Sequence, residues 1–225
     1  MEQSLAERYA AIKAGIPGGV TLVAVSKTRS ASEVQALYDL GHRDFGENYP
    51  QELREKQPAL PADIRWHFIG HLQRSNVKYL APYVHLIHGV EDERLLDEIE
   101  KRANAAGRVI DVLLQVHIAQ EETKHGLSPD ELRNAVRSWP WGSWPHVRVR
   151  GLMGMATLTD DREQVRTEFR ALHAHWSEVR NLGAFPIAEF TELSMGMSSD
   201  ADLAVQEGST MVRIGTAIFG DRAAR

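Results

Sequence analysis

The alternation of short apolar runs with amphipathic runs predicts an α/β protein, a single (β/α)8 barrel of the TIM type. Three observations support this fold class. About eight strand-like runs are each followed by a helix-like run. Two of them, 21–25 and 112–116, are apolar on both faces, as strands covered by helices are. The 225 residues suit one barrel domain spanning 1–225, and no linker interrupts them. An open doubly wound sheet is the alternative.

The strand-like runs are short, apolar and rich in β-branched residues. In chain order they cover residues 21–26, 43–46, 64–70, 84–90, 109–119, 147–155, 187–195 and 211–219. The helix-like runs have apolar residues at helical spacing. They cover residues 1–15, 30–41, 48–56, 72–82, 91–107, 128–138, 160–181 and 200–207.

Capping residues mark where several of these helices begin and end. Ser30 begins one helix, and Gly41 ends it. Ser128 is a second N-cap, with Pro129 at the first helical position. The segment WPWGSWPH at 139–146 is too apolar for a flexible linker, so we expect a loop packed against the outside of the barrel.

Composition excludes several classes of protein. The net charge of -5 provides no basic surface for a phosphate backbone, so we expect no nucleic-acid partner. The absence of cysteine excludes disulfides, thiolate zinc sites, iron–sulfur clusters and cysteine nucleophiles. No apolar stretch approaches about 18 residues, so we expect no membrane span. The first fifteen residues include acids, unlike a signal or transit peptide, which favours a cytoplasmic location.

Candidate functional residues lie at the carboxyl ends of the predicted strands, where barrels of this kind place their sites. Lys27 directly follows the first strand. Small residues with free backbone N–H groups follow the last two strands, where phosphate is commonly bound. They are Ser194, Gly196 and Ser198 after the seventh strand, and Gly215 and Thr216 after the eighth, with Arg213 late in the eighth strand itself.

The first and eighth strands are neighbours in a closed barrel, so Lys27 should lie beside this anion site. Partial burial and a nearby cation, Arg213 or Arg29, would favour the free amine of Lys27, the form that condenses with an aldehyde. A Schiff-base lysine is therefore one interpretation. A surface lysine or a simple phosphate counter-ion is the other.

Six ordered segments resemble the pyridoxal phosphate homeostasis proteins: AVSKTR, FGENYPQELREK, WHFIGHLQRSNVKYL, GLMGMAT, LSMGMSSD and GSTMVRIGTAIFG. The resemblance covers residues 20–220. It implies the barrel of alanine racemase, which is fold type III of the pyridoxal phosphate proteins, here without the C-terminal β-domain. It also implies that pyridoxal 5'-phosphate (PLP) is the cofactor, held as a Schiff base on Lys27.

The resemblance assigns further roles to individual residues. Arg213 would face the pyridine nitrogen, and a guanidinium there keeps that nitrogen unprotonated and weakens the ring as an electron sink. The phosphate would be held by Ser194, Gly215 and Thr216, with Ser198 and Gly196 close to it, and the mouth would be lined by Asn48 and His71.

The function we expect is therefore non-catalytic: a monomer that binds PLP for vitamin B6 homeostasis in the cytoplasm, buffering the cofactor or delivering it to PLP-dependent apoenzymes. A weak amino-acid racemase is the alternative. Racemisation needs a base on each face of the cofactor, and alanine racemase takes its second base, a tyrosine, from the β-domain that we expect to be absent here. Only Tyr49 lies near a strand end, where we expect it to pack at a helix start. A barrel enzyme that binds a sugar phosphate without a cofactor is a third hypothesis.

Other polar groups receive structural interpretations. His67 and His71 have the spacing of paired zinc ligands, but they lie on a strand entering a loop and no third ligand is evident, so we expect no metal site. His173 and His175 cannot face the same way on a helix. Lys124, which follows the fifth strand, could bind a cofactor during its transfer or be merely exposed, and we favour the exposed lysine. The acids at 92–98 are interpreted as a solvated helix face, and Met153 and Met155 as packing at the barrel mouth.

Overall fold

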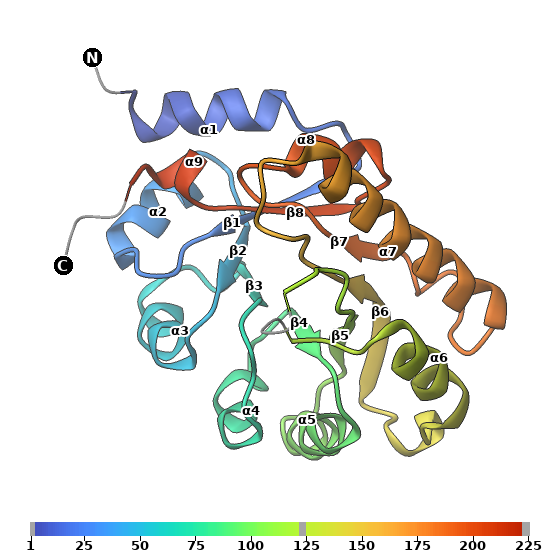
Figure 1. Ribbon diagram of the computed structural model, residues 1–225. Coiled ribbons are helices and arrows are strands. Elements are labelled where there is room, and N and C mark those ends of the chain that lie inside the picture. Colours follow the sequence, from blue (N-terminus) through green and yellow to red (C-terminus); the bar gives the residue numbers. More distant parts are fainter. Residues whose placement is uncertain (1–2, 122–124, 222–225) are drawn as a thin grey trace.

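The computed structural model describes residues 3–121 and 125–221, and it contains a closed barrel of parallel strands surrounded by helices (Figure 1). The strands run in sequence order around the barrel, and β1 closes it by pairing with β8, with Val23 opposite Arg213. They are β1 (Thr21–Val25), β2 (Asp44–Glu47), β3 (Arg65–Phe68), β4 (Leu86–Val90), β5 (Ile110–Gln115), β6 (Val147–Met153), β7 (Glu192–Ser194) and β8 (Met211–Ile214). The predicted barrel is confirmed, and the open sheet is wrong.

Helix α1 precedes β1, the other helices follow the strands, and together they cover the outside of the barrel (Figure 1). They are α1 (Leu5–Ala14), α2 (Ala31–Asp39), α3 (Pro50–Lys56), α4 (Arg74–Leu80), α5 (Glu93–Ala105), α6 (Pro129–Ser138), α7 (Arg162–Leu182), α8 (Ala201–Gln206) and α9 (Thr216–Phe219). The predicted caps at Ser30 and Ser128 are confirmed, and each forms a capping box with the glutamate three residues on. Pro129 is the first residue of α6, as predicted.

The last two predicted strands are shorter than expected. In the 187–195 run only Glu192–Ser194 is a strand, because the amides of Glu189 and Phe190 donate to the Pro186 carbonyl and form a turn. The 211–219 run leaves the sheet after Ile214 and becomes the short helix α9. Gly215 is the N-cap of that helix. The segment after β8 therefore presents a helix start toward the mouth of the barrel.

Two hydrophobic clusters stabilise the barrel. A large one fills the space between the strands and the helices. A small one of Val23, Leu86, Leu113, Met153 and Met211 is separate from it, with Met155 packed against it. The interpretation of both methionines as packing residues agrees with this cluster.

The loop 139–146 packs against the barrel as predicted. Trp144 is buried, and its Nε1 donates a 2.8 Å hydrogen bond to Asp97 on α5. Trp141 lies edge-on to Phe185, with ring centroids 4.8 Å apart. Asp97 is exposed, as expected for the acids at 92–98, and it also helps to fix this loop.

The N-terminal helix α1 lies beside α9 (Figure 1). Arg8 Nε donates a 2.8 Å hydrogen bond to the Ile218 carbonyl, which fixes α9 from outside the barrel. In residues 3–121 and 125–221, no helix combines the length and hydropathy that a membrane span requires.

Candidate functional site

A cavity of about 220 Å³ opens at the carboxyl ends of β1, β2, β7 and β8. Its size suits a ligand smaller than a typical drug molecule. Six of the nine site residues predicted from the sequence line it. The walls are formed by Val25, Lys27, Arg29, Asn48, Ile69, Met155, Met197, Ser198, Arg213, Gly215 and Thr216. A larger open groove of about 550 Å³ between α5 and α6 contains none of those nine residues.

Lys27 stands on a turn held in an unusual backbone conformation. Thr28, the next residue, has φ = 64°, in the left-handed region that side chains other than glycine rarely adopt. Its amide donates a 2.7 Å hydrogen bond to Glu52 Oε2 on α3. Lys27 itself is half-buried at the cavity wall. Helix α3 therefore fixes the turn that carries the candidate amine.

A buried ion pair supports the same turn from behind. Lys56 Nζ lies 2.7 Å from Glu47 Oε1 and 3.1 Å from Glu52 Oε2, and it donates a 2.8 Å hydrogen bond to the Ser26 carbonyl. Ser26 Oγ donates to Glu47 Oε1 at 2.6 Å. Burial raises the pKa of Glu47, and the charge of Lys56 opposes this effect. This cluster was not predicted from the sequence, because nothing in the residues around a lysine near the end of a polar helix indicates that its side chain is buried.

Arg213 forms the buried floor of the cavity. Its Nη1 donates a 2.6 Å hydrogen bond to Ser194 Oγ, and its Nη2 donates one of 3.1 Å to the Gly154 carbonyl. Burial lowers the pKa of the Arg213 guanidinium to about 10. Arg213 therefore remains a cation at neutral pH, held in one orientation.

The segments after β7 and β8 form a small polar recess in the cavity wall, made by Ser198, Gly215 and Thr216. The Gly215 amide donates a 3.4 Å hydrogen bond to Ser198 Oγ. A Cβ at position 215 would lie 3.2 Å from both the Cβ and the carbonyl oxygen of Val25. Glycine therefore keeps this recess open at the start of α9, where backbone N–H groups favour an anion.

Asn48 lines the cavity from the end of β2. Its Oδ1 is buried and has no hydrogen-bond partner among the described residues. A buried acceptor of this kind normally has a partner, so a ligand in the cavity could supply the missing donor.

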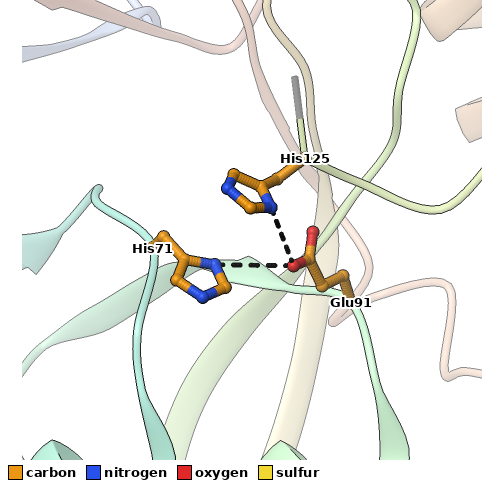
Figure 2. Close-up of side chains that lie close together, drawn as sticks. All are labelled: His71, Glu91 and His125. Carbon is orange, nitrogen blue, oxygen red and sulfur yellow. Dashed lines mark ion pairs between the residues drawn. The ribbon is translucent and has the colours of Figure 1, made fainter. Parts of the chain in front are cut away.

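Three predicted site residues do not line the cavity. Ser194 is fully buried, and its hydroxyl bonds Arg213 and His88 Nδ1. These contacts do not support the expectation that the Ser194 side chain holds phosphate, because its hydroxyl is bonded inside the barrel. Gly196 has φ = 95°, and a Cβ there would lie 2.5 Å from Ala204 Cβ, so this glycine lets α8 pack on β7. His71 is exposed and lies near Glu91 and His125 instead (Figure 2).

The remaining histidines and Tyr49 are apart from the cavity. His67 is buried inside the barrel with His88, whereas His71 is exposed, so the two do not act as a pair. His173 stacks on Trp176. His175 pairs with Glu178 instead. Tyr49 is the N-cap of α3 and is 50% exposed, so it packs less than expected. Lys124 lies outside the described residues.

The fold and cavity define an alanine-racemase-type barrel. Residues 2–223 match the family model described as "Alanine racemase, N-terminal domain". The alanine racemase of Clostridium difficile has the same fold at a TM-score of 0.77, with 14% identity. The superposition covers 98% of this chain and 57% of the racemase.

Closer relatives identify the family. The pyridoxal phosphate homeostasis protein of Aquifex aeolicus is 41% identical over 202 residues, covering 89% of this chain and 86% of the relative. The Homo sapiens protein of the same name is 39% identical, covering 89% of this chain and 76% of that protein. PipY of Synechococcus elongatus, solved with PLP bound, has a TM-score of 0.86 and 33% identity, covering 96% of this chain and 100% of PipY. The chain belongs to the pyridoxal phosphate homeostasis protein family, which confirms the resemblance found in the sequence.

Proposed function

We propose that this chain binds PLP in the 220 Å³ cavity and takes part in intracellular vitamin B6 homeostasis. The relatives named above and the PLP-bound structure of PipY support this function. The observation that carries it is the composition of the cavity wall. One primary amine, Lys27, shares that wall with the buried Arg213 cation and the recess at the start of α9.

The residues of the cavity fit the parts of the cofactor. PLP supplies an aldehyde that condenses with a primary amine, and Lys27 is the residue that would hold it as a Schiff base. Ser198, Gly215 and Thr216 would bind the phosphate. Arg213 would face the ring nitrogen, and the unpartnered Oδ1 of Asn48 would accept a hydrogen bond from the bound group.

We further propose that the bound cofactor does not turn over. Arg213 stays charged at neutral pH and can only donate hydrogen bonds, so it would leave the ring nitrogen unprotonated. Among the described residues that line the cavity, Lys27 is the one side chain that could serve as a base. No carboxylate, imidazole or phenol lies in that wall to serve as a second base on the opposite face of the cofactor. A weak amino-acid racemase is the competing function.

Several broader statements belong to the same proposal. Residues 1–225 would form one PLP-binding domain that acts as a monomer in the cytoplasm. It would buffer PLP or pass it to PLP-dependent apoenzymes, and an exposed cavity mouth suits such exchange with other amines. The net charge of -5 supports a protein without a nucleic-acid partner.

Trapping the cofactor with borohydride tests the proposal. PLP added to the purified chain should produce an absorbance band that borohydride reduces, and peptide mapping should find the adduct on Lys27. Lys27→Arg keeps the charge but removes the nucleophile, so it should lose the reducible band. Lys78→Arg, at an exposed position, is the matched control and should keep it. A reducible band of equal strength in Lys27→Arg would show that another amine holds the cofactor.

Exchange of the α-hydrogen distinguishes a binding protein from a racemase. The PLP-loaded chain is incubated with alanine in heavy water, and deuterium at the α-carbon is followed by NMR. For a binding protein, we expect the α-hydrogen of alanine to exchange only as slowly as it does with free PLP under the same conditions. Exchange at ordinary enzyme rates, lost in Lys27→Arg, would establish the racemase instead.

A further inference from the structure

Three potential metal ligands from different loops converge at the mouth of the barrel (Figure 2). His71 precedes α4, Glu91 directly follows β4, and His125 precedes α6. The Nδ1 atoms of both histidines lie 3.5 Å from Glu91 Oε1. The three candidate ligand atoms all lie within 4.8 Å of one another.

These separations suit a shared cation better than direct hydrogen bonds. A nitrogen–oxygen distance of 3.5 Å is longer than the normal range for an N–H···O bond. Ligand atoms around a tetrahedral zinc ion, with bonds of about 2.0–2.1 Å, lie about 3.3 Å apart. Both histidine–glutamate distances are therefore close to the spacing that zinc coordination imposes.

The surroundings of Glu91 also favour a cation. Its side chain is 19% exposed, and its Oε2 is buried without a hydrogen-bond partner among the described residues. A buried and unsatisfied carboxylate oxygen is costly unless another group compensates its charge. Both His71 and His125 have Nδ1 3.5 Å from the same carboxylate oxygen. Their rings are stacked, with centroids 4.3 Å apart and planes 19° apart, so each ring would turn out of this stack to place one ion in both ring planes.

Hydrogen bonding and core packing position the segments that carry the three ligands. Gln115 on β5 donates a 2.9 Å hydrogen bond from Nε2 to the His125 carbonyl. Leu72, next to His71, is buried in the core, and so is Val90, next to Glu91. His71 and Glu91 therefore lie just after β3 and β4, and His125 precedes α6 in a segment that is hydrogen-bonded to β5. Side-chain rotations would complete the site.

We propose that His71, Glu91 and His125 form a binding site for Zn²⁺. Two imidazoles and one carboxylate are ligands that zinc accepts, and three protein ligands leave a fourth position open to water or another small ligand. The sequence pair His67 and His71 shares only His71 with this site. The other two ligands come from later in the chain, so the spacing of the first pair does not reveal them.

Zinc binding to the full-length chain tests this site independently of the cofactor. The protein is dialysed against a chelator, then against buffered ZnCl₂, and bound zinc per chain is measured by elemental analysis. We expect one zinc ion per chain. His71→Ala, Glu91→Gln and His125→Ala should each weaken binding about tenfold or more, since even a second-shell change typically costs 10–100-fold. Co²⁺ should give the visible absorption bands of a low-symmetry site and lose them in the same variants.

A matched control separates this site from histidines elsewhere on the surface. His146 also faces a glutamate, Glu100, at 2.7 Å, but without a second histidine. His146→Ala should therefore bind zinc like the unaltered chain. The proposal is overturned if the unaltered chain binds no zinc, if the three ligand variants bind it equally well, or if His146→Ala loses it too. His71 and His125 are 49% and 57% exposed, so their replacement should leave the fold intact, as circular dichroism would verify.

Discussion

Arg213 Nη1 donates a 2.6 Å hydrogen bond to Ser194 Oγ beneath the candidate cofactor cavity, and both side chains are buried. A guanidinium can only donate, so the serine oxygen accepts this bond. The serine hydroxyl is then directed to His88 Nδ1, 3.1 Å away. The cation that would face the cofactor ring is therefore positioned by an uncharged group inside the barrel.

This hydrogen-bonded chain continues through the barrel to its opposite end. With His88 Nδ1 accepting, His88 Nε2 donates to His67 Nδ1 at 3.1 Å, and His67 Nε2 donates to Asp44 Oδ1 at 3.1 Å. Burial would raise the pKa of Asp44, but its hydrogen bonds with His67 and Arg65 outweigh burial and lower it. The ionised carboxylate of Asp44 can only accept a hydrogen bond, and Arg213 at the other end can only donate one. Every hydrogen bond between them therefore has its donor on the Arg213 side.

Removing the serine hydroxyl should destabilise the fold. Ser194→Ala leaves a donor of Arg213 and the acceptor Nδ1 of His88 buried without a partner, which should cost about 2 kcal/mol or more of unfolding free energy. Urea denaturation at neutral pH measures this loss. Ser199→Ala, a few residues along at an exposed position, should change the stability by less than about 0.5 kcal/mol. Equal midpoints for Ser194→Ala and the unaltered protein would contradict the proposed chain.

Stability should decrease as the pH falls below the ordinary histidine range. Burial lowers the pKa of His88 well below its ordinary value of 6.5, and burial also lowers the pKa of His42. In the unfolded chain both rings take up a proton near pH 6.5, whereas burial in the folded chain shifts their protonation to lower pH. Proton uptake by the two rings therefore favours the unfolded chain below about pH 6.5. The free energy of unfolding should be unaffected above that pH and should fall below it, by up to about 1.4 kcal/mol per pH unit for each ring.

Urea denaturation between about pH 7.5 and pH 5.5 measures this slope. His88→Gln should reduce the slope, although it should also lower the overall stability, because glutamine does not titrate. A slope unchanged by His88→Gln would show that His88 takes up its proton equally in the folded and unfolded protein, so that burial does not lower its pKa.

The barrel could be predicted because its pattern is local. Apolar runs, serine caps and glycine stops define each unit, and the carboxyl ends of parallel strands bring Lys27, Arg213 and Gly215 together. The direction of individual side chains could not be predicted in the same way. Ser194 and Ser198 were both predicted as site residues from the same segment of small residues. In the structure, the short strand β7 directs Ser194 into the barrel, whereas Ser198 lines the cavity.

Contacts between distant segments also escaped prediction. Lys56 resembles any solvated lysine at the end of a helix, and only the folded barrel places it against the buried Glu47. His71 joins Glu91 and His125 across three loops, which no spacing in the sequence shows. The ends of β7 and β8 were overestimated, because apolar residues in a turn and in a short helix resemble those in a strand.

The buried ion pair of Lys56 and Glu47, behind the turn that carries Lys27, should show strong coupling in the free energy of unfolding. Lys56→Met removes the partner of the fully buried Glu47, which should cost about 3–5 kcal/mol of unfolding free energy. Adding Glu47→Gln should recover most of this loss, since it removes the uncompensated charge. Denaturant unfolding of both single variants and the double variant measures the coupling. Lys78→Met, at an exposed position, is the control and should change stability by less than about 0.5 kcal/mol. Strictly additive losses would show that the two charges do not interact.

Filling the recess at the start of α9 should weaken PLP binding while preserving the barrel. Gly215→Ala adds a methyl group 3.2 Å from the Cβ and the carbonyl oxygen of Val25, at the residue whose recess would bind the phosphate, and its φ of -118° is open to alanine. We expect about a tenfold weaker affinity, equivalent to about 1.4 kcal/mol, in a PLP titration followed by absorbance. Gly18→Ala makes the same chemical change where nothing lies within 4 Å, so it should bind PLP normally. If both variants bind PLP as the unaltered chain does, the phosphate is held elsewhere.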